Sequence, residues 1–268
     1  MRTYRFWAEA VEDLEVDGAL QRTRVCAGSN HSEADAREEA QRRLAWVRLR
    51  IAGEASPRRE AEYEADIREP VLEALSEEAV ITRNRYGAQV LNCARLPILD
   101  VDHPPARIRD WFSRKTPEWA EARMRSVLGD LFRKPWASPL GFRLYATAQG
   151  FRVIVLGQEA LPSEPLLPRL VRALHVDPLY WTLCRKQACY RARLTPKPHR
   201  IQVPRLRLPF PLPEDRRADL DAWLETYETR SHRFATCRFL AAFGPDPAHP
   251  LVALHDQRTG AHSTRTLA

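Results

Sequence analysis

The alternation of apolar and polar residues at the start of the chain predicts two strands followed by a helix. The segment YRFWAEAVEDLEVDGALQRTRVCAGS, residues 4–29, alternates in two runs around Asp17-Gly18, a pair typical of tight hairpin turns. In the next segment, SEADAREEAQRRLAWVRLRIAG, Ser32 is a favourable helix N-cap. The apolar positions of this segment recur at helical spacing and form one stripe: Ala36, Ala40, Leu44, Val47 and Ile51. We therefore expect a small ββα unit over residues 1–58.

A core domain is expected over residues 59–268. A short helix is predicted over about residues 60–76. Two short β-type runs, YGAQVLNCA and RLPILDVD, come next, and we expect them to pair as a hairpin. A longer helix is predicted from Pro105 to Phe132, where apolar side chains are available for a buried face.

The pattern then repeats strands before helices. FRLYATAQGFRVIVLG predicts two strands around a turn at Gln149-Gly150, and SEPLLPRLVRALHVDPLYWTLCRKQ predicts a helix, a break and a second helix. The order between residues 80 and 190 is therefore β-β-α-β-β-α. This order predicts an α+β fold with a mainly antiparallel, RRM-like sheet packed with helices.

The C-terminal part of the chain is less regular. A proline-rich basic segment, residues 194–214, is expected to be extended. A helix over about residues 214–229 and about two short elements follow. His255, Asp256 and His262 in HDQRTGAHS suit a second polar site, but the simpler interpretation is an exposed polar tail.

Net charge narrows the choice of partners. The 268 residues carry a formal charge of +7, with a pI near 9.4, and most of the cations are arginines. Such a balance favours a polyanion partner such as nucleic acid or nucleotide phosphates. An arginine-rich composition typical of GC-rich genomes explains the same charge equally well.

The cysteine count and the hydropathy of the chain predict the cellular compartment of the protein. An odd number of five cysteines, widely scattered, argues against a disulfide framework, and the spacing of Cys184 and Cys189 matches no common zinc motif. Reduced, buried thiols are expected. No apolar run approaches the roughly 20 residues that span a bilayer, and the N-terminus lacks the apolar core of a signal peptide. We expect a cytoplasmic protein without a membrane partner.

Two aspartates end the apolar run LPILDVD, and His103 follows them. Residues two apart in a strand project from one face, so the carboxylates of Asp100 and Asp102 should lie side by side and need a cation or solvent nearby. Paired carboxylates suit Mg²⁺ or Mn²⁺, which also bind substrate phosphates. The alternative is a pair that caps a helix starting at Pro104-Pro105.

Basic residues gather in three further stretches. CYRARLTPKPHRI holds four within ten positions, a spacing that suits a row of phosphates or a solvated basic loop: Arg191, Arg193, Lys197 and Arg200. Arg83 and Arg85 alternate ahead of Gly87, in a run that suits either a site or a loop that braces the sheet. Arg152, next to the Gln149-Gly150 turn, suits a phosphate contact or an exposed position on an ordinary hairpin.

The order of these stretches resembles the catalytic core of archaeo-eukaryotic primases and primase-polymerases. ILDVD resembles the first motif of this family. TAQGFR is similar to the second, with Thr147 for serine and Arg152 where the family has histidine. HVDPLYW offers Asp177 as a third carboxylate, and RARLTPKPHR is similar to the basic segment that follows. The resemblance covers roughly residues 80–202, and the zinc-binding element that the family usually carries is not found.

The resemblance implies metal-dependent nucleotidyl transfer on a nucleic acid. Asp100, Asp102 and Asp177 would be catalytic, with Mg²⁺ or Mn²⁺ on Asp100 and Asp102. Nucleoside triphosphate would be bound by Thr147, Arg152 and Lys197. Template or primer would be bound by the remaining basic residues, Arg83, Arg85, Arg191, Arg193 and Arg200.

Other function classes fit the same residues. A non-catalytic nucleic-acid-binding module on an RRM-like sheet needs no aspartate pair. A metal-dependent phosphodiester hydrolase uses the same acids but consumes nucleic acid without added nucleotide. A structural or partner-docking protein is also compatible with the composition.

Overall fold

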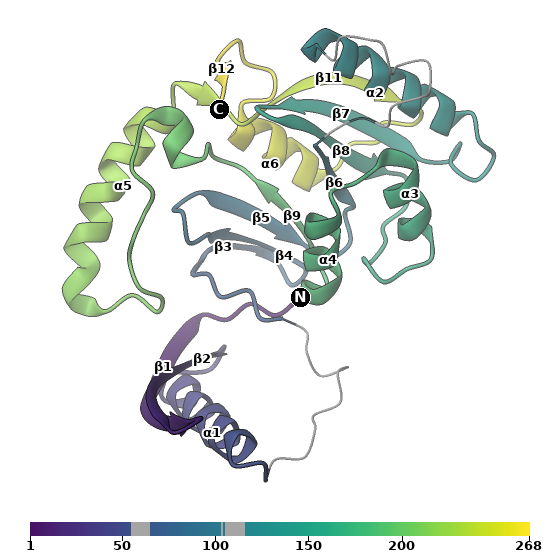
Figure 1. Ribbon diagram of the computed structural model, residues 1–268. Helices are drawn as coiled ribbons and strands as arrows, with labels where there is room; N and C mark the ends of the chain where they lie inside the picture. The colour runs from purple at the N-terminus through teal and green to yellow at the C-terminus, as the bar shows by residue number, and fades with distance from the viewer. Residues whose placement is uncertain (55–64, 103, 105–115) are drawn as a thin grey trace.

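The protein has an α+β fold, seen in a computed structural model that describes residues 1–54, 65–102, 104 and 116–268 (Figure 1). Most of its strands form antiparallel sheets, and helices pack on them. The fold class predicted from the sequence is confirmed. The RRM-like character of the sheet stays a prediction.

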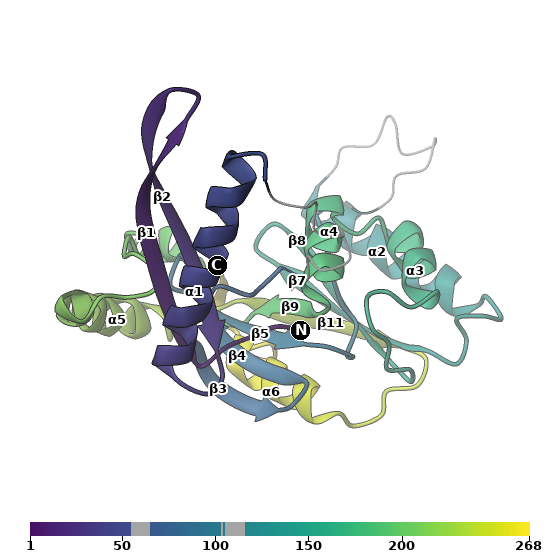
Figure 2. The same cartoon turned by 90° about the horizontal axis from the view of Figure 1, so that it is seen from below.

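An N-terminal ββα arrangement, purple and dark blue in Figures 1 and 2, lies at one edge of the molecule and contacts the remainder through Trp7 and Phe210. Its elements are β1 (Phe6–Val16), β2 (Ala19–Ser29) and α1 (Glu33–Ile51). Asp17 and Gly18 have positive φ angles of 52° and 78°, as a tight hairpin turn requires. The side chain of Ser32 caps α1 by accepting a hydrogen bond from the Asp35 amide. The predicted elements of this unit are therefore present, and the predicted boundary at residue 58 lies outside the described residues.

The apolar stripe of α1 is confirmed in its first part. Ala36, Ala40 and Leu44 are buried, and Ala40 and Leu44 pack against the hairpin in a small core of their own. Ile51 is 41% exposed, so the buried stripe ends before the last turn of the helix.

Two four-stranded sheets form the centre of the chain beyond the N-terminal unit. Sheet I has the order β3-β4-β5-β9, and its strands are β3 (Val71–Ser76), β4 (Ala79–Arg83), β5 (Gln89–Cys93) and β9 (Tyr190–Arg193). Sheet II has the order β11-β7-β8-β6, and its strands are β6 (Ile98–Val101), β7 (Gly141–Thr147), β8 (Gly150–Leu156) and β11 (Cys237–Phe243). One apolar core includes residues of both sheets. β10 (Phe234–Ala235) and β12 (Thr266–Leu267) form a short parallel pair near the C-terminus.

Helices cover both faces of sheet II (Figure 1). The helices beyond the N-terminal unit are α2 (Pro117–Phe132), α3 (Leu166–Leu174), α4 (Pro178–Gln187), α5 (Arg217–Ser231) and α6 (Pro250–Thr259). Short 3₁₀ turns, η3 (Pro198–Ile201) and η4 (Glu214–Arg216), lie at the two ends of the proline-rich segment. The helix-break-helix and the hairpin around Gln149-Gly150 are confirmed. None of the described helices combines the length and the apolar composition needed to cross a membrane.

Three local predictions need correction. Residues 71–76 form β3 instead of the end of a helix, because pairing with β4 overrides the helix propensity of Leu, Glu and Ala. β5 and β6 do not pair as a hairpin: β4 and β9 flank β5 on both sides, and β6 pairs with β8. In the described part of the predicted 105–132 helix, α2 begins at Pro117, and residues 105–115 lie outside the described residues.

Candidate functional site

A row of side chains crosses sheet II, starting from the first of the two aspartates. It consists of residues directly opposite one another on neighbouring strands: Asp100 (β6), Arg152 (β8), Tyr145 (β7) and Phe239 (β11). Directly opposed residues of antiparallel strands share one face of a sheet. The sheet register therefore places Arg152 beside the carboxylate that the sequence singles out.

Arg152 is buried, with 1% of its surface exposed. Its Nε donates a hydrogen bond to Asp100 Oδ1 at 3.0 Å, and its Nη1 donates to the backbone oxygen of Arg193 at 3.1 Å. The cation expected next to Asp100 is thus a protein side chain. A guanidinium this deeply buried does not reach the surface, so its position favours orienting Asp100 over the predicted contact with a nucleotide.

His255 of α6 supports Arg152 from the buried side. The ring is fully buried, and its Nε2 lies 3.2 Å from Arg152 Nη1. Burial lowers the pKa of His255 to about 4, so the ring is neutral near pH 7. Since Nδ1 lies 2.9 Å from Asp256 Oδ1, Nδ1 carries the proton and donates it to the carboxylate, and Nε2 accepts from Arg152.

Asp256 fixes this arrangement. Its Oδ2 accepts hydrogen bonds from Arg143 Nη2 at 3.0 Å and from His262 Nε2 at 3.1 Å. Burial alone would raise the pKa of Asp256, but hydrogen bonds from His255, Tyr145 and His262 lower it to about 2. We call Arg152, His255, Asp256 and Arg143 the buried network.

The interpretation of HDQRTGAHS as an exposed polar tail is wrong for its first two residues. His255 is fully buried and Asp256 is 9% exposed, although His262 keeps a side chain that is 59% exposed. The reason is tertiary: α6 packs against the face of sheet II that carries Tyr145, whose ring lies 4.9 Å from that of His255.

Asp102 follows the last residue of β6 and is exposed. The β7–β8 turn comes close to it, because a Cβ atom at Gly150 would lie 2.5 Å from the Val101 oxygen and 2.9 Å from Asp102 Cα. Only glycine permits this approach without a shift of the backbone. Within the described residues, no side chain donates a hydrogen bond to the Asp102 carboxylate.

Three cations lie close together: Arg193 at the end of β9, Lys197 just before η3, and Arg200 within η3. Arg193 interacts electrostatically with Asp100, and Lys197 with both aspartates. We call them the cationic cluster. Arg200 Nη2 donates to Gln149 Oε1 at 2.5 Å, which ties η3 to the β7–β8 turn. In the described part of the chain, Arg193 Nε is buried without a hydrogen-bond partner.

Burial and neighbouring positive charge lower pKa values within the cationic cluster. Burial, followed by the charge of Arg152, lowers the pKa of Arg193 to about 10. Burial and the charges of Arg193 and Arg200 lower the pKa of Lys197, against the opposite effect of Asp102 and Asp100. Cations held this close without full compensation form a favourable site for a polyanion.

Asp177 and Thr147 have less specific positions. Asp177 caps α4, with Oδ1 accepting from the Leu179 amide at 2.8 Å, and its own amide donates to the Asp100 oxygen at 3.1 Å. Among the residues that the structure describes, no three His, Cys, Asp or Glu side chains group in a way that would hold a metal ion. The third-carboxylate role of Asp177 stays a prediction, as does nucleotide binding by Thr147.

The remaining predicted nucleic-acid contacts lie apart from this cluster. Arg191 Nη2 donates to both carboxylate oxygens of Glu69, each at 2.6 Å, and Arg83 is buried and donates to the Gly87 oxygen at 3.0 Å. Arg85 is exposed and stacks on Tyr86. Arg83 and Arg191 therefore have structural partners. Of the two other predicted contacts, Arg193 interacts electrostatically with Asp100, and Arg200 is a neighbour of Arg193.

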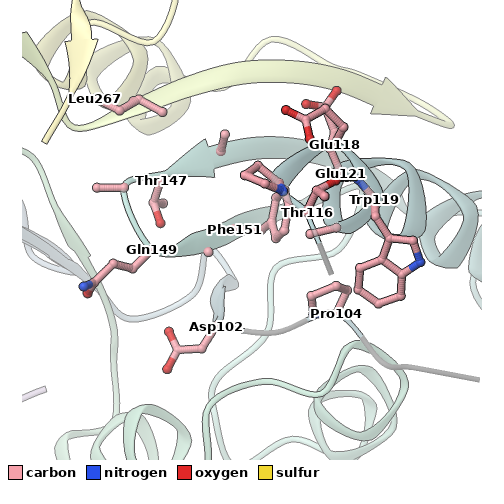
Figure 3. Close-up of a pocket in the computed structure, with 15 residues that line it drawn as sticks. Asp102, Pro104, Thr116, Glu118, Trp119, Glu121, Thr147, Gln149, Phe151 and Leu267 are labelled. Atoms are coloured by element: carbon pink, nitrogen blue, oxygen red, sulfur yellow. Dashed lines mark hydrogen bonds between the residues drawn. The ribbon is translucent and has the colours of Figure 1, made fainter. Parts of the chain in front are cut away.

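A cavity of about 640 Å³ opens beside Asp102, between α2 and the β7–β8 turn. Figure 3 shows Phe151 near its centre, Trp119 and Pro104 towards one end, and Asp102, Gln149 and Thr147 towards the other. We call the end with Asp102, Thr147 and Gln149 the polar end. At the opposite end, Glu118 and Glu121 accompany Trp119 on α2.

Sequence reasoning missed the supporting residues Arg143, Tyr145 and Gln149. Arg143 and Tyr145 are two apart in a predicted strand, which places them on the face of Arg152, and this alternation was a usable signal. Gln149 occupies the turn itself, where no pattern indicates a partner. The burial of His255 left no signal, because α6 has weak apolar periodicity.

The five cysteines are free and buried, as expected. Burial raises the pKa of Cys237 to about 11 and that of Cys189 to about 11, so these thiols are protonated near pH 7.

Comparison with protein-family models, curated proteins and solved structures found no match to this chain.

Proposed function

We propose that the protein catalyses metal-dependent nucleotidyl transfer on a nucleic acid. The observation that supports this most directly is the juxtaposition of Asp100 and Asp102 with the cationic cluster. Neighbouring carboxylates and uncompensated cations are the two components that a phosphoryl-transfer site needs, one for the metal and one for the phosphates.

The aspartates fit a divalent metal in their donor chemistry. Carboxylate oxygens are the ligands that Mg²⁺ and Mn²⁺ prefer. Asp100 uses Oδ1 for Arg152, and within the described residues no donor engages its Oδ2 or the Asp102 carboxylate. Asp100 and Asp102 would hold the ion, which when bound supplies charge neutralisation at the phosphates.

The proposed reaction joins a 3′-hydroxyl to a nucleoside triphosphate. The hydroxyl oxygen attacks the α-phosphorus, a P–O3′ bond forms, and the bond from the α-phosphorus to the bridging oxygen breaks. Pyrophosphate leaves with the electron pair, and the hydroxyl proton passes to solvent. No covalent enzyme intermediate is required, so catalysis depends on positioning and electrostatics.

Each part of the site would have one role. The cationic cluster, whose three side chains are all half-buried, would bind the triphosphate through charge-assisted contacts. Arg152 would keep Asp100 in its orientation, and His255 would keep Arg152 in place. Arg152 and His255 are thus positioning residues.

The test is titration calorimetry with Mn²⁺, with and without a nucleoside triphosphate. The variant is Asp100→Asn/Asp102→Asn, and the matched control is Asp215→Asn/Asp221→Asn, which removes two exposed carboxylates near and within α5. We expect wild type and control to bind Mn²⁺ more tightly when nucleotide is present, and the site variant to lose this binding. Primer extension with labelled nucleotide, on DNA and RNA templates, then tests the reaction itself.

Other outcomes point to other functions. Degradation of nucleic acid without added nucleotide would identify a phosphodiester hydrolase. Nucleic-acid binding that survives the double aspartate variant, with no Mn²⁺ binding by wild type, would identify a non-catalytic binding protein and overturn the proposal.

A further inference from the structure

We propose that the cavity between α2 and the β7–β8 turn binds the aromatic base of a nucleotide whose phosphates lie on the cationic cluster. The inference rests on the proposed function, because it takes the nucleotide site as its starting point. It adds a protein surface that would contact the base, which the phosphate-binding cationic cluster does not provide.

The chemistry of the cavity wall suits a base and not a phosphate. None of the 15 described residues that line the cavity is basic, whereas three are acidic: Asp102, Glu118 and Glu121. Among these described residues, a triphosphate would meet only negative charge. An uncharged aromatic ring meets Phe151 and Trp119 instead, and carboxylates at the rim are acceptors for exocyclic amino groups.

The aromatic side chains stand on rigid elements. Phe151 belongs to β8 and is 7% exposed, and Trp119 belongs to the first turn of α2, where the Thr116 hydroxyl accepts a hydrogen bond from its amide at 3.2 Å. Ring stacking needs little rearrangement when the partner ring is already ordered. A volume of about 640 Å³ lies within the range of small-molecule sites.

The cavity and the cationic cluster share a boundary. Gln149 lines the cavity and holds Arg200, and Asp102 lines the cavity and interacts electrostatically with Lys197. Figure 3 places both residues at the polar end, opposite Trp119. A nucleotide with its phosphates on the cluster would therefore enter the cavity base first, passing Asp102.

The experiment compares two ligands that differ in the base and ribose. ATP and inorganic tripolyphosphate are titrated into the full-length protein in the presence of Mg²⁺. Stacking on one aromatic side chain changes affinity by about tenfold or more, so we expect ATP to bind at least about tenfold more tightly than tripolyphosphate.

Two variants test the cavity itself. Trp119→Ala removes the stacking surface, and Ala148→Trp fills the cavity from the half-buried turn without removing a core side chain. Both should weaken ATP binding about tenfold and leave tripolyphosphate binding unchanged. The matched control is Trp46→Ala, which removes a half-buried tryptophan from α1 in the N-terminal unit.

The outcomes separate the two proposals. If wild type binds ATP and tripolyphosphate equally, or if Ala148→Trp binds ATP as wild type does, the base site is rejected and the phosphate site stands. If neither ligand binds, the proposed function and the base site both fall.

Discussion

The Asp100–Arg152 pair separates two regions with opposite electrostatic character. Behind it, in the buried network, each titratable group has a hydrogen-bond partner. Arg152 is hydrogen-bonded to His255, His255 to Asp256, and Asp256 to Arg143. In front of it, burial and neighbouring positive charge lower the pKa values of Arg193 and Lys197, and the Asp102 carboxylate receives no hydrogen bond from the described side chains.

The comparison suggests that the charges of the buried network stabilise the fold, whereas those of the cationic cluster serve to bind a ligand. A buried polar group that is fully hydrogen-bonded stabilises one conformation and has no capacity left for binding. A group of like charges destabilises the free protein, and an added anion relieves the repulsion. Mutations behind the pair should therefore change stability, and mutations in front of it should change binding.

The largest effect is expected from Arg152→Met. The variant removes a buried cation and leaves Asp100 and His255 without their partner, and breaking a buried pair in this way costs about 3–5 kcal/mol of unfolding free energy. Urea unfolding measures the loss. The matched control, Arg200→Met in the cationic cluster, should change stability by less than about 1 kcal/mol. Similar small losses in both variants would contradict the division between the two regions.

The second effect is a pH dependence of stability that His255 confers. Its pKa is about 4 in the folded protein, against 6.5 for an unperturbed histidine, because burial disfavours the charged ring. Between these two pKa values, His255 is therefore protonated in the unfolded chain and neutral in the folded protein. This contribution is full above pH 6.5 and is lost as pH falls towards 4, by roughly 3 kcal/mol.

Urea unfolding between pH 7 and pH 4 checks this slope, which His255→Asn should flatten. His31→Asn, an exposed histidine in the N-terminal unit, should keep it. Asp256 titrates in a lower window, between 3.8 and about 2, so it does not obscure the slope. The charged and titratable groups that face His255 are Arg152, Asp100, Tyr145, Cys237 and Asp256. An unchanged slope in His255→Asn would exclude His255 as the titrating group.

The sequence predicted local features well and their assembly poorly. The turn at Asp17-Gly18, the Ser32 cap and the Gln149-Gly150 hairpin are each fixed by a few neighbouring residues, and all three are present. The pairing of β6 with β8 joins residues about fifty positions apart, and no local pattern distinguishes it from a hairpin with β5. Non-local pairing therefore set the limit of the fold prediction.

The same limit applies to the candidate site. Asp100 and Asp102 were identified from their spacing, and the basic run contributed Arg193, Lys197 and Arg200. The sequence could not show that Arg152 is 1% exposed, or that Arg191 is held by Glu69, 122 residues away. Whether an arginine is a ligand or a structural residue depends on its burial and its partner, and both are tertiary properties.

The smallest change in stability, and the sharpest test of the cationic cluster, is expected from Lys197→Met. Burial and the charges of Arg193 and Arg200 lower the pKa of Lys197, so without a bound anion its charge opposes folding. The variant should be more stable than wild type by roughly 0.5 kcal/mol. Lys134→Met, an exposed lysine after α2, should leave stability unchanged.

With tripolyphosphate bound, wild type should be more stable than the Lys197→Met variant. Loss of one charge-assisted contact weakens binding about tenfold. At a concentration of 100 times the wild-type Kd, wild type then gains about 2.7 kcal/mol of stability and the variant about 1.4 kcal/mol. Thermal unfolding at two tripolyphosphate concentrations measures both values. A variant that is less stable than wild type both without and with tripolyphosphate would show that Lys197 is a structural residue. The distinction between the buried network and the cationic cluster would then be wrong for the cluster.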